Sequence, residues 1–205
     1  MSLFIPTYFS PISQYGMIYQ SEHIEFEVED NFQKQTYRNR CYIYGANGKQ
    51  MLNIPIVHSK SGIKQKTKDI QIESSTHWKK QHYKSLKSAY NSSPFFEFYE
   101  DDLMSVLDRG YKFLLDLNLH TFEFINDALD LEKSMKKTDS YQVEVEDDYR
   151  LLASVKQHPD CISDTYIQVF DDKHGFIKNL SILDLLFMEG PNSISFLEKL
   201  NVTLR

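Results

Sequence analysis

Two arginines and one histidine have types and spacings suited to chemistry on an anionic substrate. Arg38 and Arg40 lie two residues apart in a β-forming run, so a strand would place both on one face and Asn39 on the other. Such a pair can bind a carboxylate or a phosphate through bidentate hydrogen bonds. His82 follows Trp78 by four residues, so on a helix the two share a face and His82 could act as a general acid or base. The alternatives are two surface arginines on an edge strand and a histidine that is packed and hydrogen-bonded.

A proline-rich aromatic loop near the N-terminus is a further candidate. Residues 6–15 read PTYFSPISQY, in which Pro6 and Pro11 are interleaved with Tyr8 and Phe9. In an α/β protein, ligands bind at the carboxyl ends of strands, which is where a loop between a strand and a helix lies. We expect Tyr8 and Trp78 to stack on a ring of the substrate. The alternative is a structural turn filled with aromatic side chains.

The last candidate precedes an apolar helix close to the C-terminus. Ser181 is placed to cap this helix, and Asp184 in its first turn favours the helix dipole. A ligand-binding role would require the amide of Asn179, or the helix N-terminus itself, to hold an anion. A plain helix cap explains the same residues.

The elements that position these residues alternate between strands and helices, which predicts an α/β fold, with α+β as the alternative. An Asn47-Gly48 turn joins two of the strands in a hairpin. Two segments, 59–68 and 133–148, are expected to be loops. Strands are expected over 3–5, 24–28, 36–44, 51–57, 69–72 and 166–170. Helices are expected over 12–20, 76–90, from 94 or 101 to 108, 110–131 with a possible break near Asn118, 181–189 and 192–200.

Composition bounds the class of protein. The chain has 205 residues, 41% hydrophobic and 25% charged, which indicates one globular domain over 1–205. Aromatic residues reach 14%, a share that requires either a large core or a surface that binds something. The net charge of −6 argues against general nucleic-acid binding. Eight lysines against two acids in 58–87 give a local +6, which could meet an anionic substrate or nucleic acid, although two solvated surfaces of opposite sign are the simpler explanation.

Targeting and metal signals are missing from the sequence. The N-terminus lacks a basic region and a long apolar run, and no segment reaches 18 apolar residues, so neither a signal peptide nor a membrane span is expected. We therefore expect a cytoplasmic protein in which Cys41 and Cys161 are reduced structural thiols. His77 and His82 have the wrong spacing for two ligands on one helix face, and no metal is expected.

Several short motifs follow one another in a fixed order along the chain. They are Pro6, Tyr8, Phe9 and Pro11 followed by Tyr15; Tyr-Arg-Asn-Arg at 37–40; Asn-Ile-Pro-Ile at 53–56; Trp78, His82, Leu86, Tyr90 and Ser-Pro-Phe-Phe at 93–96; Leu117-Asn118; and 166–170 with 179–191, which include Asn179, Ser181 and Gly190-Pro191. This ordered set resembles the WbqC-like family of bacterial proteins. The chain departs from the family at Ile5, where many members have glutamine, and in the charged stretch 132–165, where many members have further strand–helix units.

The resemblance implies a fold and a pathway. The family looks like a Rossmann-like, nucleotide-binding layered sheet flanked by helices, and it is associated with gene clusters for O-antigen and other surface polysaccharides. We therefore expect an enzyme that transfers an acyl or aminoacyl group to a nucleotide-linked amino sugar, with a nucleotide or nucleotide sugar as its possible cofactor. The alternative is a non-catalytic accessory protein that binds a polysaccharide precursor or a partner enzyme.

Overall fold

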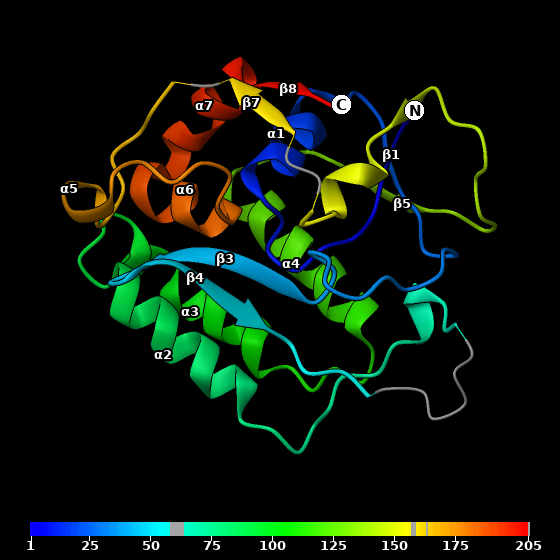
Figure 1. Cartoon of the computed structure of the whole chain (residues 1–205), viewed down its shortest axis with the longest axis horizontal. Helices are drawn as coiled ribbons and strands as arrows, with labels where there is room; N and C mark the ends of the chain where they lie inside the picture. Colours follow the sequence, from blue (N-terminus) through cyan, green and yellow to red (C-terminus); the bar gives the residue numbers. More distant parts are fainter. Residues whose placement is uncertain (58–63, 157–158, 163, 205) are drawn as a thin grey trace.

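Four short parallel strands form the central sheet, in the order β5-β2-β1-β6. The computed structural model describes residues 1–57, 64–156, 159–162 and 164–204 (Figure 1). Helices flank the sheet, so the predicted α/β class is confirmed. The strands are β1 (Ser2–Phe4), β2 (Ile24–Phe26), β5 (Met135–Lys137) and β6 (Asp147–Asp148).

Two antiparallel pairs and seven α-helices complete the part of the chain that the structure describes. In Figure 1 the hairpin β3–β4 lies between α6 on one side and α2 and α3 on the other. The pairs are β3 (Arg40–Gly45) with β4 (Gly48–Asn53), and β7 (Asp160–Ile162) with β8 (Asn201–Thr203). The helices are α1 (Ile12–Gln20), α2 (Trp78–Tyr90), α3 (Phe96–Asp108), α4 (Leu114–Ala128), α5 (Asp171–His174), α6 (Ile182–Glu189) and α7 (Ser193–Lys199), with 3-10 turns η1 (Thr67–Asp69), η2 (Arg150–Ala153) and η3 (Gly190–Asn192).

The helices follow the predicted apolar spacing. Helix α1 has the predicted bounds, and α2 buries Trp78, His82, Leu86 and Tyr90, which recur every four residues. Helix α2 begins at Trp78 and not at residue 76 as expected, and its N-cap is His77, whose side chain makes no capping bond. Helix α4 passes through Asn118 without the expected break. No described helix has the length and apolar character needed to cross a membrane.

The predicted strands fail where pairing depends on distant segments. Residues 36–39 do not continue β3, because Tyr37 is held by two loops: its N–H donates to Ala153 O at 2.8 Å, and its carbonyl accepts from Tyr8 N at 2.9 Å. The strands expected over 54–57, 69–72 and 166–170 are also absent. The first two of these segments make only isolated bridges. Conversely, β5 and β6 lie within 133–148, which was expected to be a loop. They pair with β2 and β1 through the backbone, and such pairing needs no apolar pattern in the sequence. Residues 59–63 of the other expected loop lie outside the described residues.

The loop between β1 and α1 is buried and held by residues from three distant segments. Asn118 of α4 donates its side-chain amide to Pro6 O at 3.1 Å and to Arg38 O at 2.8 Å. Ser181 donates its hydroxyl to Phe9 O at 2.8 Å. Phe9 has a φ of 38°, a left-handed conformation that a non-glycine residue adopts only when its surroundings enforce it. These hydrogen bonds satisfy buried carbonyls that water cannot reach.

A buried carboxylate joins the C-terminal helices to the hairpin. Asp184 of α6 is 0% exposed and accepts hydrogen bonds from Tyr90 Oη at 2.6 Å, Tyr166 Oη at 2.5 Å and Gln168 Nε2 at 2.9 Å. Tyr90 Oη in turn accepts from the backbone N–H of Tyr44 at 3.0 Å. Burial raises the pKa of Asp184, and the three donors oppose that effect. Asp184 therefore lies in the first turn of α6, as predicted, and is also part of a buried hydrogen-bond network.

Replacing Asn118 with alanine should destabilise the fold strongly. The change leaves two buried carbonyls without donors, and we expect the free energy of unfolding to fall by about 2–4 kcal/mol. Chemical denaturation followed by circular dichroism measures this loss. Asn91→Ala, at the exposed end of α2, is the control and should change stability by less than about 0.5 kcal/mol. Equal effects of the two variants would contradict the role assigned to Asn118.

Candidate functional site

The predicted catalytic histidine lies in the hydrophobic core. His82 is 3% exposed, and both ring nitrogens contact protein groups: Nδ1 lies 2.9 Å from Tyr8 Oη and Nε2 lies 3.2 Å from Asn53 O. Because a carbonyl only accepts, Nε2 carries the proton and Nδ1 accepts from Tyr8. Burial lowers the pKa of His82 to about 4, although the bond to Asn53 opposes this shift. The arrangement matches the packed, hydrogen-bonded alternative for this residue.

The predicted stacking residues gather around His82. The Tyr8 and Trp78 rings meet edge to face with centroids 6.5 Å apart, and the Trp78 and His82 rings lie 5.1 Å apart. Tyr8 is 0% exposed, and Tyr15, also buried, packs against Phe122. The rings of Tyr8, Trp78 and His82 therefore pack against one another, and the burial of Tyr8 and Tyr15 leaves neither ring exposed to a ligand.

Asn179 and Ser181 close the N-terminus of α1. The side-chain oxygen of Asn179 accepts from Ser13 N at 2.9 Å, and Leu180 O accepts from Ile12 N at 2.9 Å. Ser181 caps α6 as predicted, by accepting from Leu183 N at 3.3 Å. Pro11 forms a bridge with Ser181 beside these bonds. The first N–H groups of α1 are therefore occupied by protein acceptors and not by an anion.

The arginine pair is separated, which corrects the expectation of a joint receptor on one strand face. Arg38 lies in the turn before β3, is 3% exposed and forms an ion pair with Asp30. Arg40 is the first residue of β3 and lines another cavity, of about 380 Å³, together with Asn39 and Asn53. The two guanidinium groups face different cavities because residues 37–39 turn instead of extending the strand.

A polar cavity of about 750 Å³ lies at the carboxyl edge of the parallel sheet, and we call it the edge cavity. Residues that follow each of the four strands line it: Ile5 after β1, Glu29 after β2, Tyr141 after β5 and Arg150 after β6. The carboxyl edge is where open α/β sheets bind their ligands. The remaining lining residues are Asp30, Asn31, Phe32, Gln33, Arg38, Lys64, Lys66, Asp148, Leu151 and Ser154.

Opposite charges are paired around the edge cavity. Glu29 accepts from both Lys66 and Lys68, and these hydrogen bonds lower its pKa. Arg150 donates to Asp148 through Nε at 2.9 Å and Nη2 at 2.6 Å, which lowers the pKa of that carboxyl although burial opposes it. Both carboxylates are therefore ionised at neutral pH. The cavity offers fixed acceptors and cations, the groups that bind sugar hydroxyls and phosphates.

Most of the edge cavity was not predicted from the sequence. Of its lining residues, only Arg38 was among the predicted site residues. Glu29 and Asp30 follow the predicted strand 24–28 directly, so charged side chains just after a strand were an available signal. Asp148 and Arg150 gave no such signal, because the strand that precedes Arg150 has no apolar pattern.

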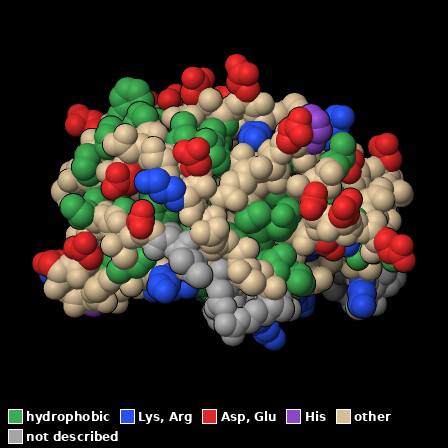
Figure 2. All heavy atoms as spheres, turned by 90° about the horizontal axis from the view of Figure 1, so that it is seen from above, with side chains coloured by type: hydrophobic (Ala, Val, Ile, Leu, Met, Phe, Trp, Pro, Cys, Tyr) green, Lys and Arg blue, Asp and Glu red, His purple; other side chains and the backbone are tan. Residues whose placement is uncertain are grey.

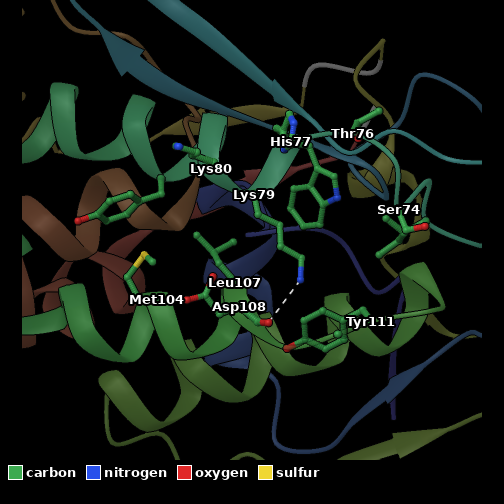
Figure 3. Close-up of a pocket in the computed structure, with 13 residues that line it drawn as sticks. Ser74, Thr76, His77, Lys79, Lys80, Met104, Leu107, Asp108 and Tyr111 are labelled. Carbon is green, nitrogen blue, oxygen red and sulfur yellow. Dashed lines mark hydrogen bonds between the residues drawn. The ribbon is translucent and has the colours of Figure 1, made fainter.

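A second cavity, of about 530 Å³, lies between α2 and α3 and includes Trp78 in its lining. Figure 3 shows the Lys79 side chain extending towards Asp108 and Tyr111. Its Nζ donates to Arg109 O at 2.6 Å and to Asp108 O at 3.5 Å, so this cation caps the carbonyls at the end of α3. We favour the edge cavity as the site because it lies at the carboxyl ends of parallel strands and is lined by more charged groups.

A third cavity, of about 580 Å³, lies between α3 and α4, away from the carboxyl ends of the strands. Figure 2 shows acidic, basic and hydrophobic side chains interspersed over one face, so that face offers no continuous basic surface for nucleic acid. Among the described residues, no group of three or more His, Cys, Asp or Glu side chains is placed to hold a metal ion.

The buried His82 should make stability depend on pH. Its pKa is about 4 in the folded protein against about 6.5 in the unfolded chain, so between these values the unfolded chain binds the additional proton. Stability is therefore full above about pH 6.5 and falls towards pH 4, by about 1.4 kcal/mol per pH unit from this group. Denaturation curves of the wild type and His82→Gln across this range should differ in slope by about that amount. The exposed His77→Gln control should keep the wild-type slope, and a wild-type slope in His82→Gln would refute the assignment.

Comparison with known proteins identifies the family. Residues 6–168 match the model of the WbqC-like protein family. The match covers the buried loop after β1, the residues 37–40 and all but Ile5 of the edge cavity, and it ends before Asn179 and Ser181. Searches of curated proteins and of solved structures found no match. Since the matched segment is most of its length, the chain belongs to the WbqC-like protein family.

Proposed function

We propose that this protein binds a nucleotide-linked amino sugar in the edge cavity and transfers an acyl or aminoacyl group to it in bacterial surface polysaccharide biosynthesis. One observation carries the proposal: paired charges line a cavity of about 750 Å³ at the carboxyl edge of a parallel sheet. That volume suits a nucleotide-sized ligand. The pathway rests on the gene-cluster association that membership of the family implies.

The charges of the edge cavity suit the two ends of such a substrate. Lys64 and Lys66 line it from one segment and supply cations for phosphate oxygens. Glu29 and Asp148, ionised at neutral pH, can accept hydrogen bonds from sugar hydroxyls and from an ammonium group. In the transfer, the amine attacks the acyl carbon, the bond from that carbon to the carrier group of the acyl donor breaks, and the carrier leaves with the electron pair. The attacking nitrogen loses a proton, for which the carboxylates of the cavity are the candidate bases. His82 is left out of this step because both of its nitrogens are occupied in the core.

The non-catalytic alternative is supported by the same position of His82. A protein that only binds a polysaccharide precursor needs the edge cavity but no accessible acid or base. Incubation with a nucleotide amino sugar and an acyl donor, followed by mass spectrometry, separates the two functions. Acylated sugar that forms in proportion to enzyme supports the transferase, and tight binding without product supports the accessory protein.

Lys66 and Lys68 form a matched pair for testing the site. Both bind Glu29 and are similarly exposed, but only Lys66 lines the edge cavity. If Lys66 contacts a phosphate, Lys66→Gln should weaken nucleotide-sugar binding about fivefold to tenfold in calorimetry, a loss of about 1 kcal/mol. Lys68→Gln should stay within about twofold of the wild type. Equal effects, or no binding of any nucleotide sugar by the wild type, would contradict the proposed site.

A further inference from the structure

Tyr141 is an exposed aromatic side chain at the edge cavity that the surrounding structure holds in place. Its side chain is 53% exposed, although aromatic residues of this chain are mostly buried. The guanidinium carbon of Arg150 lies 5.1 Å from the centre of its ring. Both residues line the edge cavity. A large ring kept at the mouth of a polar cavity is a surface suited to binding another ring.

The hydrogen bonds of Arg150 hold its guanidinium group against this ring. Its Nε and Nη2 donate to Asp148, and its Nη1 donates to Gln142 O at 2.7 Å, so each nitrogen of the guanidinium has a protein acceptor. The group is therefore fixed in position and has little capacity left for a phosphate. We treat Arg150 as a positioning residue whose planar face orients Tyr141.

Glu27 anchors the segment on both sides of Tyr141. This carboxylate is 0% exposed, and it accepts from Thr138 Oγ1 at 2.9 Å and from Gln142 N at 3.0 Å. Thr138 N also donates to Phe26 O at 3.0 Å, at the end of β2. Tyr141 therefore lies between two residues, Thr138 and Gln142, that are both hydrogen-bonded to Glu27. Because this segment is already held in place, a ligand that stacks on the ring does not lose affinity by ordering it.

We propose that Tyr141 is the stacking platform for the nucleobase of the ligand, an inference that rests on the proposed nucleotide-linked substrate. A cation on one ring face withdraws electron density from the ring, which favours a flat π-system on the other face over the C–H groups of a sugar. With the base on Tyr141, the phosphates extend into the cavity that Lys64 and Lys66 line. Tyr141 then selects ligands that carry a base over sugar phosphates that lack one.

The test compares ligands with and without a base on the full-length protein. The probes are the amino-sugar nucleotides of uridine, guanosine, cytidine and thymidine, and the same sugar as its 1-phosphate, measured by calorimetry. Tyr141→Ala should weaken the best-bound nucleotide sugar about tenfold and leave the sugar phosphate unchanged. Tyr141→Phe, which keeps the ring, should bind like the wild type. The control Val143→Ala changes a 79% exposed residue of the same segment, and it should have no effect.

Three outcomes would overturn the platform. Wild-type affinity in Tyr141→Ala refutes it while leaving the proposed function standing, and an equal loss for both probes assigns the ring to the sugar instead. No binding of any probe by the wild type refutes both proposals together. Arg150→Gln tests positioning: it should lower affinity for the nucleotide sugar only, and it should add nothing to Tyr141→Ala if it acts through that ring.

Discussion

The hydrogen bonds from the side chain of Asn118 to Pro6 O and Arg38 O are the constraint on which the rest of the structure depends. They join α4 to the loop after β1 and to the turn before β3, at carbonyls that no water reaches. Without them, two loops that approach the core would carry unpaired polar groups. Because the loop is held, Tyr8 can bond His82 and Phe9 can keep its left-handed backbone conformation.

The residues that resemble the family pattern form this frame, whereas the open cavity is built largely from other residues. Tyr8, His82, Asn118 and Ser181 contact one another or the backbone of the buried loop. The edge cavity is lined by charged side chains that follow short strands, and its ion pairs keep these side chains ordered. This division explains why a motif-based choice of site selected core residues: aromatic and amide groups with fixed spacing are needed for packing as much as for binding.

The elements of the fold also divide into those that could be predicted from the sequence and those that could not. Helices α1, α2 and α6 were predictable because the apolar spacing of each lies within its own segment, and α6 also has its cap at Ser181. The strands β5 and β6 were not, because short strands at or near the edge of a parallel sheet pair through the backbone and carry charged side chains. The strand expected over 36–39 failed because Tyr37 bonds to Ala153 and Tyr8, which are far away in the chain.

The sequence by itself determined the α/β class, the family resemblance and most helix positions, since these depend on local periodicity and on the order of short motifs. Only the tertiary structure decided that His82 is sealed in the core, that Arg38 and Arg40 face different cavities and that Glu29, Tyr141 and Arg150 meet at one sheet edge. The physical reason is that burial and convergence arise from contacts between residues distant in the chain. The spacing of residue types along one segment carries no information about those contacts.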